Sequence, residues 1–250
     1  MINVLIYGLG HIGGSLALSI KKNLSKSHKV LGIDTSKPTI KKIKEKKLFK
    51  TAKAGSKEAS SMLSNADLIF VCVSPNNIEE VFKIIKQSDT KKNLIVSDVA
   101  SIKSDVVLLA KKYLKKISFV GGHPIAGTEK SGFQNSDSNL FKNKIFIVSG
   151  SHGSKKSVAT ISSIWRKLGT KVLSLEPKKH DKVFAYLSHL PHALSFCLSK
   201  TALKNFSKND IVKFGGSSYR DYSRISSSSN KLWTEIFLSN KENLTSSLND

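Results

Sequence analysis

Three glycines near the amino terminus have the spacing of a dinucleotide-binding turn. Gly8, Gly10 and Gly13 fit the pattern G-x-G-x-x-G, which follows a short apolar run and opens a helical segment. The first glycine of such a turn permits a tight bend, the second lets the backbone approach a pyrophosphate, and the third lets helix and strand pack closely. The N–H groups that begin the helix, at His11 and Ile12, would then face the phosphates. The sequence therefore predicts a dinucleotide site in this turn.

An acidic side chain stands where a nucleotide ribose would be bound. Asp34 ends the second apolar run, 21 positions after the last glycine of the motif. A carboxylate there accepts hydrogen bonds from the adenosine ribose, so NAD is expected rather than NADP. Ser36 and Lys37 follow closely and would tolerate a 2′-phosphate, which keeps NADP as the alternative. Ser74, which follows the apolar run 68–73, is a further candidate for contact with the cofactor.

Two polar segments follow later apolar runs. They are residues 97–103 (SDVASIK) and 121–129 (GGHPIAGTE). Ligands of open α/β sheets bind outside the carboxyl ends of strands, so we expect Ser101 and His123 to line one cleft beside the cofactor. An imidazole suits acid–base catalysis because its ordinary pKa lies close to working pH. The alternatives are structural, since Ser101 would also suit a helix N-cap and His123 would suit a cap on the glycine-rich turn.

Two further segments, 181–192 (DKVFAYLSHLPH) and 218–224 (SYRDYSR), also concentrate polar side chains. His189 and His192 lie three residues apart, which raises the possibility of a metal pair. No third ligand with matching spacing follows them, so no metal site is expected.

Arg224 is the strongest candidate for binding a carboxylate. A guanidinium group forms two parallel hydrogen bonds with a carboxylate, which a lysine cannot reproduce. Asp181 and Asp221 are expected to pair with Arg224 and set its direction. Arg220 and Asp221 have a structural alternative as a surface ion pair, which would contribute little.

Strand and helix patterns alternate through the first part of the chain and would position these residues. Apolar runs typical of strands lie at 3–7, 29–33, 68–73, 94–97, 118–121, 145–148 and 171–175, and helical patterns lie at 12–24, 37–47, 76–86, 102–114 and 158–168. Such alternation predicts a parallel sheet covered by helices on both faces.

The pattern changes after Glu176-Pro177. Only helical segments follow, interrupted near Pro191 and at Gly215-Gly216. We therefore predict an α/β protein in which a Rossmann-type dinucleotide-binding domain (residues 1–176) is followed by an all-helical domain (residues 177–250).

The formal net charge of +23 is large for 250 residues. A strongly basic chain can bind nucleic acid. However, the lysines are spread along the whole sequence, only three arginines are present, and no zinc-finger or RNA-recognition pattern occurs. We therefore expect no nucleic-acid partner, and attribute the charge to compositional bias. The charge would still help to attract an anionic substrate.

The composition also bears on the compartment. No apolar run approaches the roughly 18 residues of a membrane helix, so no membrane association is expected. Cys72 and Cys197 are the only cysteines and make no disulfide framework, and Met1–Tyr7 lacks a signal-peptide pattern. These features favour a cytoplasmic protein.

Five segments together resemble the signature blocks of prephenate and arogenate dehydrogenases. They are SDVASIK (97–103), GGHPIAGTEKSG (121–132), YLSHLPH (186–192), YRDYSRI (219–225) and LWTEIFLSNKENL (232–244). The resemblance runs from Asn3 to about Leu244. It implies a Rossmann domain followed by a helical domain that builds a homodimer.

The resemblance also implies a reaction. That reaction is the NAD-dependent oxidative decarboxylation of prephenate to 4-hydroxyphenylpyruvate in tyrosine biosynthesis. The alternative is an arogenate or cyclohexadienyl dehydrogenase that forms tyrosine directly, with NADP as a further option. Arogenate carries an ammonium group where prephenate carries a keto group. With Asp181 and Asp221 assigned to Arg224, no carboxylate is left to pair with that ammonium, so prephenate is expected.

Roles for individual residues follow from the same resemblance. His123 would accept the proton of the substrate hydroxyl as hydride leaves, and Ser101 would hydrogen-bond that hydroxyl or steady the imidazole ring. The substrate-binding residues implied are His192, Arg224, Ser188, Thr128 and Glu129.

Two other functions are alternatives to this one. Another Rossmann enzyme with a helical domain, of the 3-hydroxyacid or 6-phosphogluconate type, would carry a lysine or asparagine at its active centre in place of the 121–132 block. A basic nucleic-acid-binding protein on a Rossmann scaffold would show a salt-dependent gel shift.

Overall fold

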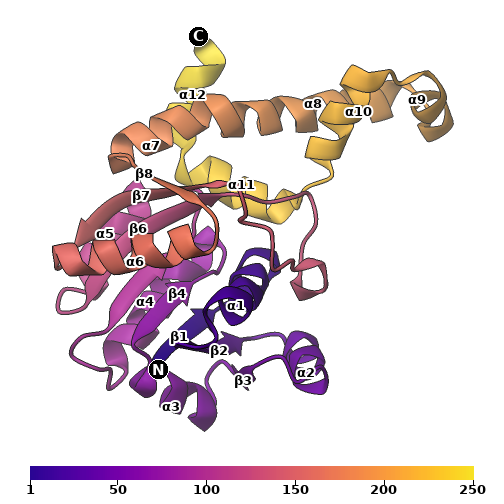
Figure 1. Cartoon of the computed structure of the whole chain (residues 1–250). Helices are drawn as coiled ribbons and strands as arrows, with labels where there is room; N and C mark the ends of the chain where they lie inside the picture. Colours follow the sequence, from indigo (N-terminus) through magenta and orange to yellow (C-terminus); the bar gives the residue numbers. More distant parts are fainter.

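The computed structural model describes residues 1–250 and contains one eight-stranded sheet flanked by helices (Figure 1). Its strands are β1 (Ile2–Tyr7), β2 (His28–Asp34), β3 (Lys50–Lys53), β4 (Leu68–Val71), β5 (Ile95–Asp98), β6 (Ser118–Ile125), β7 (Ile145–His152) and β8 (Lys171–Ser174). They lie in the order β3-β2-β1-β4-β5-β6-β7-β8. The order reverses between β1 and β4, and ligands of doubly wound sheets bind beyond the carboxyl ends of the strands at such a point. The Rossmann-type fold expected from the sequence is confirmed.

Two strands run against the expected direction. The sequence pattern predicted a parallel sheet, and β1 to β6 pair in parallel, but β7 is antiparallel to β6, and β8 is parallel to β7 and so shares its direction. A parallel return requires a crossover of a dozen or more residues, which usually contains a helix. Between Ile125 and Ile145 the chain forms only the short 3-10 turn Phe133–Asn135. The chain therefore returns directly alongside β6.

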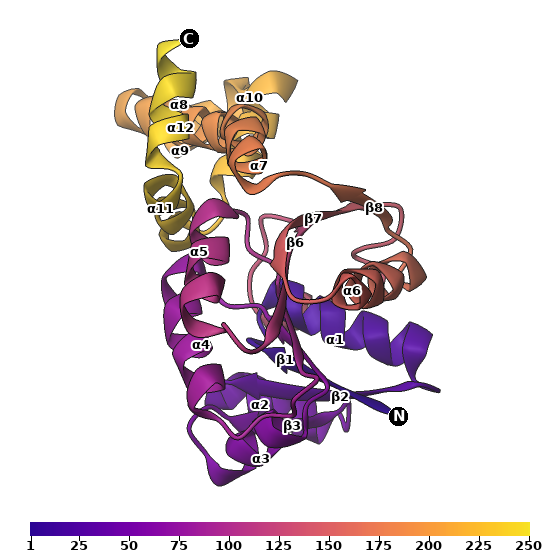
Figure 2. The same ribbon diagram turned by 90° about the vertical axis from the view of Figure 1, so that its left-hand side faces the viewer.

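Helices cover both faces of the sheet. They are α1 (His11–Leu24), α2 (Lys37–Glu45), α3 (Lys57–Asn65), α4 (Ile78–Gln87), α5 (Ser104–Tyr113) and α6 (Lys155–Lys167). Figure 2 shows α1 and α6 on one side of the sheet and α4 and α5 on the other. Leu5 and Tyr7 join the core with α3, α4 and α5, whereas Val4 and Ile6 join the core with α1 and α6. This division follows from the alternation of side chains along a strand.

Two of these elements were not predicted from the sequence. Strand β3 has four residues, of which only Thr51 and Ala52 are buried, so its apolar pattern is too short to recognise. Helix α3 is rich in serine and buries only Ala59, Met62 and Leu63. Both elements therefore owe their structure to packing at the edge of the sheet more than to local sequence preference.

The remainder of the chain is helical. It consists of α7 (Pro177–Phe184), a π-helical turn (Ala185–His189), α8 (Leu190–Asn205), α9 (Lys208–Phe214), α10 (Ser217–Ser226), α11 (Asn230–Ser239) and α12 (Lys241–Asn249). The interruption expected near Pro191 takes the form of the π-helical turn. Proline has no N–H with which to continue an α-helical ladder, and Leu190 bonds instead to the carbonyl of Ala185, five residues back.

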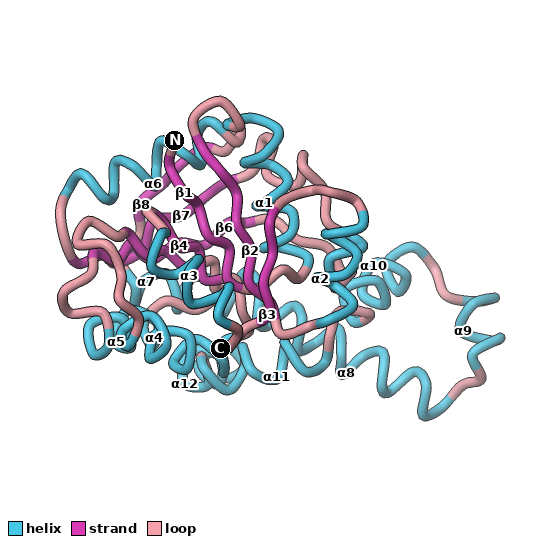
Figure 3. The backbone as a smooth tube through the Cα atoms, turned by 90° about the horizontal axis from the view of Figure 1, so that it is seen from below, coloured by secondary structure: helices cyan, strands magenta, loops and turns pink.

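Helices α8, α9 and α10 form an arm that extends away from the sheet (Figures 1 and 3). Ser195 is the only buried residue of α8, and α9 and α10 contain none. Several large apolar side chains of the arm are exposed, including those of Leu203, Phe206, Val212 and Phe214. Helix α11 returns to the sheet, where Ile236 joins the core beside α4 and α5.

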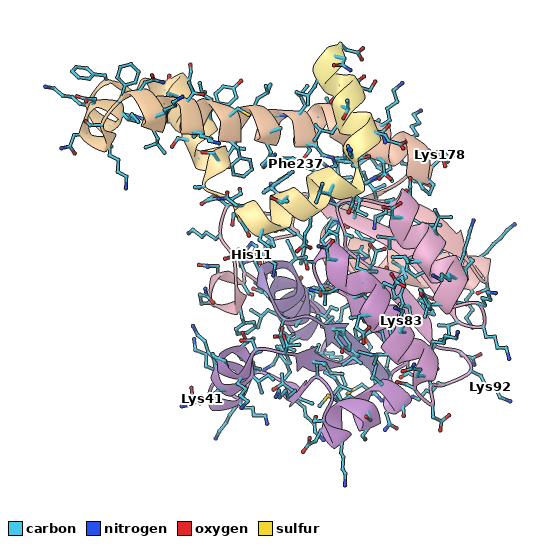
Figure 4. The ribbon with its side chains drawn as sticks, turned by 180° about the vertical axis from the view of Figure 1, so that it is seen from behind. His11, Lys41, Lys83, Lys92, Lys178 and Phe237 are labelled. Carbon is cyan, nitrogen blue, oxygen red and sulfur yellow. The ribbon has the colours of Figure 1, made fainter.

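Lysines project from well-separated parts of the surface. Figure 4 shows Lys41, Lys83, Lys92 and Lys178 at widely separated positions on the face that it presents. None of the helices combines the length and the apolar character that crossing a membrane requires.

Candidate active site

The glycine turn between β1 and α1 leaves room for a ligand on one side only. Gly8 has a φ of +98°, and a Cβ atom there would lie 2.5 Å from the carbonyl oxygen of Cys72. A Cβ atom on Gly13 would lie 1.9 Å from the carbonyl oxygen of Gly8. At Gly10, by contrast, a Cβ atom would meet nothing within 4 Å. The turn is thus closed against the sheet and open in front of α1, as close approach of a pyrophosphate requires.

The start of α1 carries polar groups without partners. No side chain caps the helix at Gly10, so its first N–H groups are free to bind an anion. Both ring nitrogens of His11 are buried and lack a hydrogen-bond partner. Ile12 is the next residue of this first turn. These features fit the phosphates of a dinucleotide.

Asp34 lies directly beside the glycine turn. Its Oδ2 accepts a hydrogen bond from the N–H of Leu9 at 2.6 Å, and its Oδ1 accepts one from the N–H of Ser36 at 2.7 Å. The carboxylate is therefore fixed next to the turn, where a ribose would reach it. Ser74 follows β4, the strand beside β1, and its hydroxyl accepts a hydrogen bond from Asn77 at 2.9 Å.

His123 is buried in β6, beyond the part of that strand that pairs with β5. Its Nδ1 lies 2.8 Å from Nε2 of His180 on α7. The ring of Phe184 packs against both imidazoles, with centroids 4.8 Å and 4.5 Å away. Burial lowers the pKa of His123 well below its ordinary value, and the nearby His180 and Lys103 lower it further. His123 is therefore neutral near pH 7 and able to accept a proton.

His180 and Asp181 were not singled out, as a pair, from the sequence. Nδ1 of His180 lies 2.9 Å from Oδ1 of Asp181. Oδ1 and Oδ2 of Asp181 also accept the N–H groups of Lys103 and Ser104, at 2.8 Å and 2.7 Å. The expected pairing of Asp181 with Arg224 is therefore wrong, because this buried carboxylate is fully engaged at the start of α5.

A buried ion pair supports the same region. Nζ of Lys103 donates to Asp98 and, at 2.8 Å, to the carbonyl oxygen of Gly122. Asp98 also accepts the N–H of Gly122 at 3.0 Å and the N–H of Ala100 at 2.8 Å. The pair thereby joins the ends of β5 and β6, directly before His123. The sequence signal for it was an aspartate and a lysine five residues apart behind a buried strand.

Ser101 lies in the bend between β5 and α5 and is partly buried. It is not a helix N-cap, because α5 begins at Ser104 and its capping position is Lys103. No hydrogen bond joins its hydroxyl to His123, whose Nδ1 is held by His180. The hydroxyl of Ser101 is therefore available to a ligand.

His192 and Ser188 lie on successive turns of the long helical segment. Nδ1 of His192 donates to the carbonyl oxygen of Ser188 at 2.8 Å, and the imidazole stacks on Trp233 with ring centroids 3.5 Å apart. The half-buried His192 ring is thus held flat against α11.

His189 has a structural role. Its Nδ1 accepts a hydrogen bond from the side-chain amide of Asn240 at 3.0 Å, and the same amide donates to the carbonyl oxygen of Asp181 at 2.8 Å. Burial lowers the pKa of His189 to about 4. Through Asn240, which precedes α12, this histidine therefore joins the π-helical turn to α7 and to the start of α12. No group of three or more His, Cys, Asp or Glu side chains is arranged to hold a metal ion.

Arg224 on α10 reaches the loop that follows β6. Its Nη1 lies 4.0 Å from Oε2 of Glu129, and its side chain is 61% exposed. Thr128 in the same loop accepts the N–H of Lys130 at 3.2 Å. Asp221, the second carboxylate expected to pair with Arg224, is exposed and forms no ion pair with it. The partner of Arg224 is therefore Glu129.

The loop between β6 and β7 connects the arm with the glycine turn. Its residue Asp137 donates its N–H to the hydroxyl of Ser15 in α1 at 3.0 Å. Helix α11 also reaches the 3-10 turn Pro75–Asn77 before α4, where Glu235 accepts the N–H of Asn76 at 3.3 Å. The loop that follows the strand carrying His123 thus extends from Glu129, beside Arg224, to the glycine turn, where the Ser136 hydroxyl donates to the carbonyl oxygen of Gly10 at 3.5 Å.

Two successive segments of the chain match known protein families. Residues 16–174 match the family described as prephenate dehydrogenase, nucleotide-binding domain. Residues 176–250 match the family described as prephenate dehydrogenase, dimerization domain.

Individual relatives agree with these matches. The prephenate dehydrogenase of Lactococcus lactis subsp. cremoris is 33% identical over 97% of this chain, and the chain spans 66% of that relative's length. The crystal structure of Aquifex aeolicus prephenate dehydrogenase in complex with hydroxyphenyl propionate and NAD+ is 32% identical, with a TM-score of 0.90 over 100% of this chain and 86% of that one. The crystal structure of Synechocystis arogenate dehydrogenase is 28% identical, with a TM-score of 0.79 over 100% of this chain and 87% of that one.

Proposed function

This chain belongs to the prephenate dehydrogenase family, and from that premise we propose that it catalyses the NAD-dependent oxidative decarboxylation of prephenate to 4-hydroxyphenylpyruvate, in tyrosine biosynthesis. The observation that carries the proposal is the buried, neutral imidazole of His123, held through Nδ1 so that Nε2 is free to accept a proton. NAD, when bound, supplies the acceptor for the hydride that leaves the alcohol carbon.

The proposed catalytic residues act on the substrate hydroxyl. His123 accepts its proton as the hydride leaves, and the partly buried hydroxyl of Ser101 hydrogen-bonds the same oxygen. Hydride loss and departure of the ring carboxylate as carbon dioxide give an aromatic ring, which provides the driving force. The protein's task is to orient the ring and to hold its carboxylates.

The proposed substrate-binding residues surround that position. Arg224 binds a carboxylate through its guanidinium fork, and the Glu129 carboxylate beside it orients the fork. His192 contacts the substrate with its ring held on Trp233, and Ser188 lies one turn before it. Thr128 stands at the cleft entrance beside Glu129.

The proposed cofactor site is built from the glycine turn and the ends of the neighbouring strands. Its residues are Gly8, Gly10, His11, Ile12, Gly13, Asp34 and Ser74. The free N–H groups at the start of α1 would receive the pyrophosphate, and Asp34 would receive the ribose hydroxyls.

We place the domain boundary between residues 176 and 177, and propose that residues 177–250 form a homodimer. The two family matches, which end at residue 174 and begin at residue 176, support the boundary. The match to a dimerization domain and the many exposed apolar side chains of the arm support the dimer, because exposed apolar surface is typical of subunit contacts. The two free cysteines are compatible with the cytoplasm.

Initial rates decide the proposed function. The purified chain is given prephenate or arogenate, each with NAD or NADP, and reduced nicotinamide is followed by absorbance. Turnover of prephenate with NAD supports the proposal, and absence of turnover in all four combinations contradicts it.

Asp34 is expected to make NAD the preferred cofactor. Its carboxylate repels a 2′-phosphate and accepts hydrogen bonds from a free ribose. Replacing it by serine (Asp34→Ser) removes the charge, so the ratio of kcat/KM for NAD to that for NADP should fall by roughly tenfold or more, about 1.4 kcal/mol. A wild-type protein that already uses NADP better would show that Asp34 does not select the cofactor.

Prephenate is expected to be preferred over arogenate when the two compete in one assay. Asp181 is occupied by His180 and α5, so it is unavailable to the ammonium of arogenate. An unpaired buried ammonium loses affinity. A higher kcat/KM for arogenate would overturn this expectation, and equal values would indicate a cyclohexadienyl dehydrogenase of broad range.

One observation favours arogenate as the second candidate substrate. Glu129 carries a carboxylate near the proposed substrate site, and its 4.0 Å distance from Arg224 is a loose pairing. If this carboxylate receives the ammonium, Glu129→Gln will lower kcat/KM for arogenate more than that for prephenate. An equal change for both substrates leaves Glu129 as the partner of Arg224 only.

A further inference from the structure

Three buried side chains form a linear hydrogen-bonded series that ends at His123. Oδ1 of Asp181 lies 2.9 Å from Nδ1 of His180, and Nε2 of His180 lies 2.8 Å from Nδ1 of His123. We propose that His180 and Asp181 are a positioning dyad that sets the tautomer of His123 and stabilises the imidazolium formed when it takes the substrate proton. This inference rests on the proposed role of His123 as the base.

The direction of each hydrogen bond follows from the carboxylate at the end of the series. Burial raises the pKa of Asp181, but the hydrogen bonds from His180, Ser104 and Lys103 outweigh it, and the net shift is downward. Asp181 is therefore ionised and only accepts hydrogen bonds. Nδ1 of His180 must then carry a proton. Because burial lowers the pKa of His180, the ring is neutral and its Nε2 is an acceptor.

The same logic fixes His123. Its Nδ1 must donate to Nε2 of His180, so the proton of the neutral ring resides on Nδ1. Nε2 of His123 is then left with a free lone pair, which is the state required of a base. In the proposed reaction one proton moves, from the substrate hydroxyl to Nε2 of His123, and it returns to the phenolate oxygen after carbon dioxide has left. The protons on the two Nδ1 atoms stay in place.

The dyad is held rigidly from two helices. The N–H groups of Lys103 and Ser104, at the start of α5, fix both carboxylate oxygens of Asp181 on α7. Phe184 packs against the rings of His123 and His180. The imidazole of His123 therefore keeps its orientation without help from a bound ligand, which is the usual benefit of an oriented base.

The positive charges around His123 disfavour its protonated form, so a carboxylate is needed to stabilise that form. Lys103 at the start of α5 lies close enough to disfavour a positive charge on the ring, although Asp98 on β5 pairs with it. The imidazoles of His180 and of His189, in the π-helical turn, also oppose protonation. Asp181 supplies the compensating negative charge, and it acts on His123 through the imidazole of His180, which is hydrogen-bonded to both. Its removal should therefore depress protonation of His123 further and alter the tautomer.

The test replaces Asp181 by its isosteric amide. The amide of Asp181→Asn carries no charge; when its Nδ2 faces Nδ1 of His180 it donates there, opposite the N–H of Lys103, which reverses both hydrogen bonds and places the proton of His123 on Nε2. We expect kcat to fall on the order of 10²–10⁴-fold, as for the corresponding change in serine-protease triads, while NAD affinity measured by calorimetry changes less than about twofold. ¹⁵N NMR of histidine-labelled protein without substrate should show Nε2 of His123 unprotonated in the wild type and protonated in the variant.

Second variants cover the case in which Asp181→Asn does not fold. His180→Phe keeps an aromatic ring but removes both nitrogens, and His180→Gln offers an amide oxygen that can still accept from Nδ1 of His123. The glutamine variant should retain roughly tenfold more activity than the phenylalanine variant, the value of one hydrogen bond of about 1.4 kcal/mol.

His152→Asn is the matched control, because His152 is a partly buried histidine of β7 that bonds only to the carbonyl of Leu114. It should leave the rate and the spectrum of His123 unchanged.

The outcomes separate this inference from the proposed function. A wild-type spectrum with Nε2 of His123 protonated, or normal kcat in the folded dyad variants, overturns the dyad. If His123→Asn loses turnover while the dyad variants keep both rate and tautomer, only the dyad is wrong. If His123→Asn also keeps its turnover, the proposed role of His123 is wrong as well.

Discussion

Replacing His123 by asparagine should lower turnover on the order of 10²–10⁴-fold, the span found when a positioned acid or base is lost. Asparagine approximates the shape of the ring near Cβ and can still hydrogen-bond, but it cannot take up a proton. The loss should appear in kcat with little change in the affinity for NAD, because the glycine turn and Asp34 are on other strands. Steady-state rates and cofactor titration measure the two effects separately.

The pH profile provides a second measure of the same residue. The pKa of His123 is held well below its ordinary value by burial and by the nearby His180 and Lys103. The base is therefore in its active, neutral form down to pH values below the ordinary histidine range. The acid limb of kcat/KM should accordingly lie below that range in the wild type and disappear in His123→Asn. Near-normal turnover of the variant would remove His123 from the mechanism, and His152→Asn serves as the control.

Truncating Arg224 to alanine should raise the apparent KM by roughly 30-fold or more, equivalent to about 2 kcal/mol, the lower end of the range for one partner of a buried charge pair. The lower end is appropriate because the guanidinium is 61% exposed and is screened by water before the substrate binds. Arg224→Lys should restore only part of the affinity, because an ammonium lacks the planar fork. KM at fixed saturating NAD measures both variants.

Arg220 offers a matched control for this result. It lies one turn earlier on α10, is also exposed, and donates from Nε to the carbonyl oxygen of Gly215 at 3.1 Å. Arg220→Ala should change KM by less than about threefold, as most surface substitutions do. Full recovery by Arg224→Lys would show that charge, and not the geometry of the fork, binds the carboxylate. A change of kcat alone would place Arg224 in the chemical step instead.

Local patterns were sufficient to predict most of the first domain. The glycine spacing, the buried apolar run of β4 and the position of Asp34 follow rules that involve only neighbouring residues, and they identified the fold. The direction of β7 was missed because it depends on what the 19-residue connection before it contains; the lack of a helical pattern in that connection is the sequence signal that no helical crossover is present. Strand β3 was missed because a four-residue edge strand has too short a pattern.

The candidate site, like the fold, could be predicted from local sequence patterns only in part. His123 and Ser101 became candidates because polar residues follow strands at these two positions. The contact between His180 and His123 could not be predicted in this way. His180 and Asp181 are adjacent residues of one helix, and their contact with His123 depends on where α7 packs against β6. The role assigned to Asp181 was wrong for the same reason, since sequence spacing could not show that the start of α5 already occupied its carboxylate.

The arm of α8 to α10 has a thermodynamic consequence. Helices of this length are marginal in water unless they bury an apolar face, and the arm buries almost nothing within its own chain. Its folding free energy must then come from a second copy, if the proposed homodimer is formed. The melting of the arm becomes a bimolecular equilibrium, and its midpoint rises with protein concentration. Dilution would then unfold α10, the helix that carries Arg224, while the Rossmann domain stays folded. Activity per subunit would therefore fall on dilution.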